Sequence, residues 1–171
     1  MGNGFEKEKE HFSTTRDVFT ARLESFIIDT DKYLEAAIIG EIGNNTFDHN
    51  FIFGNICQKG VYCNYNFQER YVVLADYGRG IKGSLAQVVV NIKNDLEALE
   101  IAFTKKISGR SPEQRGNGLK FVSEIIRDNN WDLYFQSGKG CCFINKNGIN
   151  YSKSDTVVSG CLAVINFHGG N

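Results

Sequence analysis

The chain of 171 residues lacks several features that would assign a function directly. It has a single proline, and its cysteines include no CxxC pair: Cys57, Cys63, Cys141, Cys142 and Cys161. Because the three histidines also miss the usual zinc-ligand spacing, we expect reduced thiols and no structural zinc site. No GxxxxGK[ST] segment occurs, which excludes a P-loop nucleotide site.

Charge and hydropathy narrow the class further. The formal net charge is -1, so no electrostatic argument favours a nucleic-acid or membrane-surface partner. No apolar run approaches the roughly 20 residues that span a bilayer, and no secretory signal is recognisable. We therefore expect one soluble, cytoplasmic domain over residues 1–171, in which the charged residues 1–12 are flexible.

Hydrophobic spacing predicts an α+β fold. Helices are expected from Asp29 or Asp31 (either a plausible N-cap) to Asn50, over 93–107 and over 118–129. Strands are expected at 61–67, 71–78, 132–137, 140–146, 149–153 and 160–167, with a hairpin turn in 146–150. Residues 15–28 have no clean period, so helix and strand stay open there. This order predicts a two-layer sandwich, a mixed and mostly antiparallel sheet with helices on one face.

The first group of candidate site residues lies in GEIGNNTFDHN (40–50). Glu41, Asn45 and His49 are spaced four apart and project from one helical face. A carboxylate and a carboxamide on one wall suit a magnesium–triphosphate site, because the amide oxygen is a hard ligand and the carboxylate can deprotonate a nucleophile. A solvated polar face on an amphipathic helix explains the same spacing.

The second motif is DYGRGI (76–81), at the end of an apolar strand. The Asp76 carboxylate can accept a hydrogen bond from an exocyclic amine, which is worth about 1.5–3 kcal/mol. Gly78 and Gly80 let a flat ring approach without a Cβ collision. An ordinary Asp–Gly turn is the alternative.

The third motif is RGNGLKFV (115–122), in which glycines lead into a helix. Free N–H groups and the helix dipole favour a phosphate there. A loop that simply precedes a helix explains these residues equally well.

In this order the three motifs resemble the GHKL superfamily, which includes gyrase-type topoisomerases, the ninety-kilodalton heat-shock chaperone, histidine kinases and mismatch-repair ATPases. The resemblance runs from about residue 30 to residue 167. In size the chain is similar to the anti-sigma-factor serine kinases, whose helix motif ends in a histidine where His49 stands. The resemblance implies a Bergerat-type fold that binds ATP and Mg²⁺.

The resemblance also implies roles for the matching residues. Glu41 would be the general base, and Asn45 would coordinate Mg²⁺. The other residues implied to contact the nucleotide are Asp48, His49, Asp76, Gly78, Gly80, Ile81, Arg115, Gly116, Gly118 and Leu119. Residues 82–115 would form an ATP lid, from which Arg110 could also reach the triphosphate. Cys161 stands where the family often has threonine, and a thiol is the weaker donor and acceptor.

Several functions fit this resemblance. The chain would hydrolyse ATP or transfer its γ-phosphate to a protein partner, with Glu41 as base. Alternatively, it would be a nucleotide-gated interaction module with little or no turnover. A stand-alone histidine kinase is not expected, because about forty residues precede Glu41 and His11 lies in a charged segment without apolar heptads. Donation to a separate phosphotransfer protein stays open.

Overall fold

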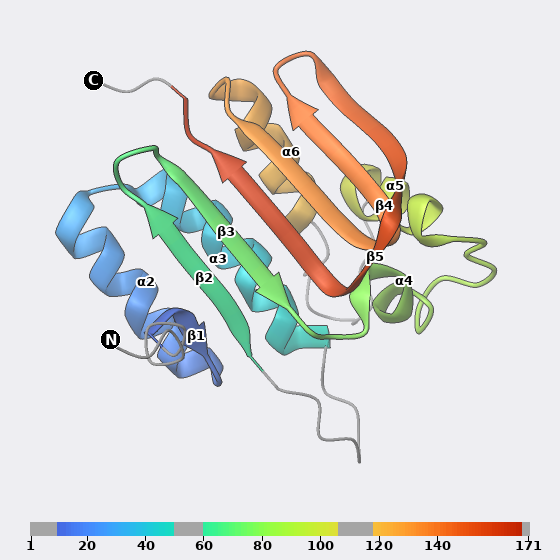
Figure 1. Ribbon diagram of the computed structural model, residues 1–171, viewed down its shortest axis with the longest axis horizontal. Helices are drawn as coiled ribbons and strands as arrows, with labels where there is room; N and C mark the ends of the chain where they lie inside the picture. The colour runs from blue at the N-terminus through green and yellow to red at the C-terminus, as the bar shows by residue number, and fades with distance from the viewer. Residues whose placement is uncertain (1–9, 50–59, 106–117, 169–171) are drawn as a thin grey trace.

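The computed structural model describes residues 10–49, 60–105 and 118–168, whose elements form two layers (Figure 1). The helices are α2 (Arg16–Thr30), α3 (Tyr33–His49), α4 (Gly80–Leu85), α5 (Asp95–Thr104) and α6 (Gly118–Asp128). The strands are β1 (Phe12–Ser13), β2 (Val61–Asn66), β3 (Tyr71–Asp76), β4 (Asp132–Asn145) and β5 (Gly148–Asn166). They form one sheet in the order β1-β2-β3-β5-β4, and every described strand pair is antiparallel. The α+β class and the antiparallel sheet are confirmed.

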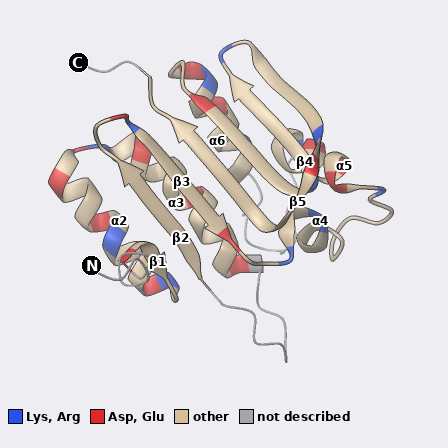
Figure 2. Ribbon diagram, viewed as in Figure 1, with Lys and Arg blue, Asp and Glu red and all other residues tan. Residues whose placement is uncertain are grey.

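The register of the central strands brings distant parts of the sequence together. Leu74 of β3 lies opposite Ala163 of β5, and both are buried beneath the helices. Two residues further along, Asp76 lies opposite Cys161. Within the described strands β2 and β3, Asp76 is the only charged residue, and most charges lie on helices and turns (Figure 2).

The four short strands expected after residue 132 are in fact two long ones. β4 and β5 form a hairpin whose turn lies at 146–147, within the predicted turn. Register shifts occur between Ser137 and Gly138 and between Gly138 and Gly140. A bulge of this kind bends a strand without ending it. At Gly138 φ is 61°, and the Asp95 carboxylate occupies the space that a Cβ would need, so the glycine marks a bend and not a loop.

The ambiguous segment at 15–28 is the helix α2, and it packs on α3 through glycine. The side chain of Thr15 caps its start, and Asp31 ends it in the left-handed conformation at φ 55°. Asp31 is therefore the C-cap of α2, not an N-cap of α3. The Phe19 ring, 2% exposed, lies directly over Gly43, so that a Cβ there would stand 2.6 Å from Phe19 Cε1.

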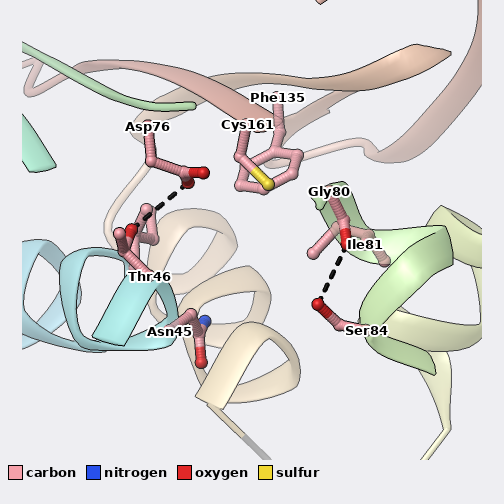
Figure 3. Close-up of a pocket in the computed structure, with 9 residues that line it drawn as sticks. Asn45, Thr46, Asp76, Gly80, Ile81, Ser84, Phe135 and Cys161 are labelled. Carbon is pink, nitrogen blue, oxygen red and sulfur yellow. Dashed lines mark hydrogen bonds between the residues drawn. The ribbon is translucent and has the colours of Figure 1, made fainter. Parts of the chain in front are cut away.

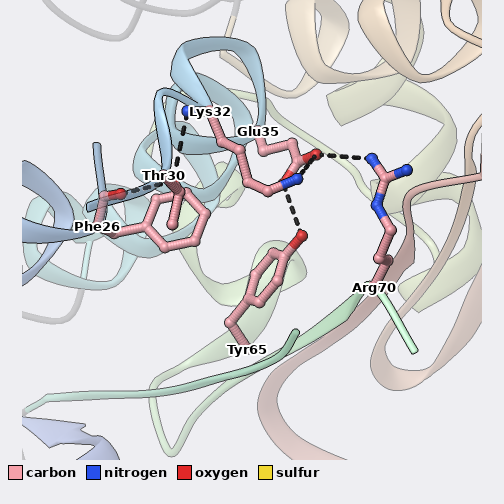
Figure 4. A network of polar contacts seen from close by, with 6 residues as sticks. All are labelled: Phe26, Thr30, Lys32, Glu35, Tyr65 and Arg70. Atoms are coloured by element: carbon pink, nitrogen blue, oxygen red, sulfur yellow. Dashed lines mark hydrogen bonds and ion pairs between the residues drawn. The ribbon is translucent and has the colours of Figure 1, made fainter. Parts of the chain in front are cut away.

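A buried carboxylate fixes the start of α3 against the β2–β3 hairpin (Figure 4). Glu35 is only 4% exposed, and it accepts hydrogen bonds from the Tyr65 hydroxyl (2.6 Å), Lys32 Nζ (3.1 Å) and Arg70 Nη2 (3.2 Å). Buried charges are tolerated when they are paired in this way. The network therefore holds α3 in one position along the sheet.

Helix α5 belongs to the core. It begins after the N-cap Asn94 and buries Ala98, Leu99, Ile101 and Phe103. The Phe103 ring meets Phe135 of β4 edge-on, with centroids 5.3 Å apart. These residues lie inside the 82–115 range predicted as a lid. Movement of α5 away from the sheet would expose Leu99 and Phe103 to water and would therefore cost hydrophobic free energy. The part of that range at 106–115 lies outside the described residues.

Phe12, at the end of the segment expected to be flexible, pairs with Tyr62.

No helix in the described part of the chain is long and apolar enough to cross a membrane.

Candidate functional site

Two of the three sequence motifs meet at a cavity between α3, α4 and the ends of the central strands (Figure 3). Its walls are Ile42, Asn45, Thr46, Asp76, Gly80, Ile81, Ser84, Phe135 and Cys161. Five of these were predicted for the site: Asn45, Asp76, Gly80, Ile81 and Cys161. The cavity holds about 30 Å³, which is room for one or two water molecules.

The Asp76 carboxylate is held at both oxygens. Oδ1 accepts from the backbone N–H of Gly78 at 2.6 Å, as in an Asp–Gly turn. Oδ2 accepts from the Thr46 hydroxyl at 3.2 Å. The turn expected as the alternative reading of DYGRGI is therefore present, and it orients the carboxylate at the cavity wall.

Sequence reasoning missed Thr46. It directly follows Asn45, but its side chain lies on the buried face of α3 at 5% exposure. A hydroxyl on the apolar face of the helix is the sequence signal that could have identified it. Its hydrogen bond to Asp76, thirty positions away, links the first motif to the second.

Cys161 lies opposite Asp76 in the register of β3 and β5. Burial raises the pKa of its thiol above the ordinary value, and the neighbouring Asp76 carboxylate raises that pKa further. The group is therefore a neutral thiol at neutral pH. It can donate a weak hydrogen bond toward Asp76, but it cannot act as a thiolate nucleophile there.

Glu41 and the third motif meet beside this cavity. Glu41 is exposed on α3 and is not among the residues that line the cavity. Its carboxylate lies over Gly118, the first residue of α6, where a Cβ would stand 2.5 Å from Oε2. Near it, Asn44 Oδ1 is buried without a hydrogen-bond partner among the described residues. The middle of α3 therefore presents a carboxylate to the first residue of α6, and a buried amide oxygen without a partner lies one helical turn further along α3.

Two further predicted residues, Asp48 and Leu119, do not line the cavity. Asp48 forms an ion pair with Arg16 of α2 and does not line the cavity. Leu119 is 8% exposed and belongs to the core. His49 is the last residue of α3, and its side chain lies outside what the structure describes. The residues predicted in the loop before α6 also lie outside the described ranges: Arg110, Arg115 and Gly116.

A second cavity of about 230 Å³ lies on the other side of Gly80. Gly80 lines both cavities. The other walls of the second are Gly78, Arg79, Lys82, Asp95, Ser137, Gly138, Val158, Ser159 and Gly160. Gly78, predicted for the base pocket, therefore faces this second cavity.

Within the described ranges, no group of three or more His, Cys, Asp and Glu side chains could hold a metal ion. A magnesium ion here would need oxygen ligands from a bound molecule and from water in addition to an amide oxygen.

No model of a known protein family matches the chain, and no curated protein matches it. Among solved structures, it is similar to the 43K ATPase domain of Thermus thermophilus gyrase B in complex with an aminocoumarin, at 15% identity and a TM-score of 0.45. The similarity covers 84% of this chain and 38% of that chain. It concerns fold alone.

Proposed function

We propose that the chain is an ATP-binding domain that hydrolyses ATP or transfers its γ-phosphate to a protein partner in a Mg²⁺-dependent reaction. The observation that carries the proposal is the Asp76 carboxylate. It ends a central strand at a cavity, Thr46 and the Gly78 N–H orient it, and the Cys161 thiol lies beside it. A carboxylate held in this way suits the exocyclic amine of adenine.

The residues around Asp76 would accommodate a flat ring once the walls of the cavity move apart. Gly80 and Gly160 have φ of 69° and 83°, and a Cβ on either would collide with neighbouring atoms. Glycine therefore keeps the backbone close to the carboxylate. The cavity holds about 30 Å³, so we expect its walls to move apart when a purine binds. Side chains such as Ile81 and Ser84 can move without breaking the sheet.

The phosphates would extend toward the start of α6. Asn45 lines the cavity and would supply an amide oxygen to Mg²⁺. When bound, Mg²⁺ neutralises charge on the phosphates and polarises them. The N–H groups of the first turn of α6 would bind phosphate oxygens.

Glu41 is the group that would handle a proton. Its carboxylate lies over Gly118, so it stands next to the predicted phosphate position. From there it would orient a water molecule or a hydroxyl and accept its proton. Phosphoryl transfer depends mainly on such positioning and on charge stabilisation.

One observation favours the alternative of a nucleotide-gated module with little turnover. Glu41 is exposed and lies outside the cavity lining, so a bound nucleotide need not engage it. A module of this kind would bind ATP and change its interactions without rapid hydrolysis.

Calorimetric titration with ATP, with and without Mg²⁺, tests the proposal. We expect wild type to bind and Asp76→Asn to lose at least about ten-fold in affinity, since hydrogen bonds to charged groups are worth about 1.5–3 kcal/mol. Asp132→Asn is the matched control, because this carboxylate at the start of β4 pairs with His168 and does not line the cavity. Equal ATP binding by Asp76→Asn and wild type would refute the adenine site.

Phosphate release and phosphoryl transfer distinguish the two functions. For an enzyme we expect Glu41→Gln to lower turnover by about 10²–10⁴-fold while it retains ATP binding. The exposed Glu124→Gln on α6 is the control. ATP binding with no turnover in wild type would favour the module.

A further inference from the structure

A single buried hydroxyl ties the start of α4 to both strands of the β4–β5 pair. Ser137 of β4 is 3% exposed and lies opposite Cys161 in the register. Its Oγ accepts a hydrogen bond from the Ile81 N–H at 2.9 Å and donates one to the Gly160 carbonyl at 2.9 Å. We call Ser137, Ile81, Gly160 and Gly80 the seam.

Ser137 performs a capping function for α4. The first N–H groups of a helix have no acceptor within the helix. The N-cap residue, Arg79, makes no side-chain cap, and the Ser137 hydroxyl accepts from Ile81 instead. The acceptor comes from a residue 56 positions away, so the cap fixes α4 to the sheet as well as completing its first turn.

The seam is closely packed and separates the two cavities. A Cβ at Gly80 would stand 2.6 Å from Ser137 Oγ, and one at Gly160 would stand 2.6 Å from Asp76 Oδ1. Ile81 lines the first cavity, Ser137 and Gly160 line the second, and Gly80 lines both. The position of the α4 wall relative to Asp76 therefore depends on this hydroxyl.

We propose that Ser137 is a positioning residue of the nucleotide site. It ties the backbone N–H of Ile81 to the β4–β5 pair beside the first cavity, and so sets where a base can lie. The inference rests on the proposed function, because it assigns Ser137 a role in the binding of ATP. Removal of the hydroxyl leaves a buried N–H and a buried carbonyl unpaired, which loosens the first turn of α4.

Two measurements test the proposal: hydrogen exchange at the Ile81 amide in nucleotide-free protein, and the Kd for ATP. In Ser137→Ala we expect the Ile81 amide to exchange at least about ten-fold faster and the Kd to rise by about ten-fold or more. Ser137→Thr keeps the hydroxyl and should restore most of both. If Ser137→Ala does not fold, Ser137→Cys keeps a weaker donor and acceptor and should give intermediate values.

Ser13→Ala is the matched control. Ser13 is a fully buried serine of β1 whose Oγ accepts from Arg22 Nη1 at 3.2 Å, and it does not line either cavity. This variant should leave the Kd and the Ile81 exchange rate within about two-fold of wild type.

The outcomes separate this inference from the proposed function. ATP binding in Ser137→Ala that stays within two-fold of wild type overturns the positioning role, and so does an equal loss in Ser13→Ala. If wild type itself does not bind ATP, the proposed function fails and the role at a nucleotide site fails with it. The Ile81 exchange rate then still reports whether the hydroxyl holds α4.

Discussion

The carboxylate of Glu41 lies over the Cα of Gly118, so closely that a Cβ there would stand 2.5 Å from Oε2. This contact joins the middle of α3 to the first residue of α6, 77 positions further along the chain. It explains why a glycine is needed at the start of α6: a larger residue would displace the carboxylate.

The first prediction concerns this pair. Gly118→Ala should lower ATP turnover by about ten-fold or more, because the carboxylate proposed to position the nucleophile must move. Stability should not fall, since the colliding atom is the end of a flexible side chain and alanine favours a helix by up to about 1 kcal/mol. Phosphate release and thermal unfolding measure the two effects. Lys120→Ala, also in the first turn of α6, is the control. Wild-type turnover in Gly118→Ala would remove the assigned role of this contact.

The second prediction concerns the thiol beside Asp76. Cys161→Thr replaces a weak donor and acceptor by a hydroxyl. A neutral hydrogen bond contributes about 0.5–1.5 kcal/mol, so the Kd for ATP should fall by roughly two- to ten-fold. Cys161→Val has a similar shape without the hydroxyl and should not improve binding. If valine and threonine give the same Kd by calorimetry, hydrogen bonding at this position does not contribute.

The third prediction concerns the packing of α2 on α3. Gly43→Ala drives a methyl group into the Phe19 ring and should destabilise the protein by about 1–3 kcal/mol. Gly40→Ala is the matched control, because its Cβ would meet only the flexible Leu23 Cδ2 at 3.0 Å. Urea unfolding followed by circular dichroism measures both. Phe19→Leu should recover part of the loss in the Gly43→Ala background, and equal stability of the two glycine variants would contradict the contact.

The fourth prediction concerns alkaline pH. Burial raises the pKa of Cys63 and of Cys142 to about 12, and it also raises the pKa of Cys161. The unfolded chain loses these protons above about pH 8.5, so it binds fewer protons than the folded protein and stability falls as the pH rises. The loss approaches about 1.4 kcal/mol per thiol for each pH unit.

Urea unfolding under reducing conditions between pH 8.5 and 10 checks this dependence. The Cys63→Ala variant should show a shallower decline than wild type, because one titrating group is gone. An unchanged slope in that variant would show that Cys63 does not titrate differently in the folded and unfolded states.

The sequence predicted the features that local patterns encode. Helical spacing located α3, α5 and α6 to within a few residues, and the apolar run before Asp76 located β3. Of the five predicted residues that line the cavity, Asn45 and Asp76 lie on α3 and β3, Gly80 and Ile81 open the short helix α4, and Cys161 lies on β5.

Other features depend on contacts between distant residues. The Ser137 hydroxyl resembles any strand serine until the register places it opposite Cys161. Helix α2 lacks a clear period because its one fully buried side chain, Phe19, packs on a glycine of another helix. The bulge at Gly138 breaks the hydrophobic alternation and made one strand read as two.

The small volume of the cavity has a consequence for any affinity that is measured. When the form that accepts a ligand is only a fraction of the molecules, the apparent Kd equals the intrinsic value divided by that fraction. A substitution that merely favours the closed arrangement would therefore weaken binding without touching the nucleotide, and one that favours the open arrangement would strengthen it. For a nucleotide at the proposed site, the measured affinity would report how often the cavity opens as well as how well its walls fit.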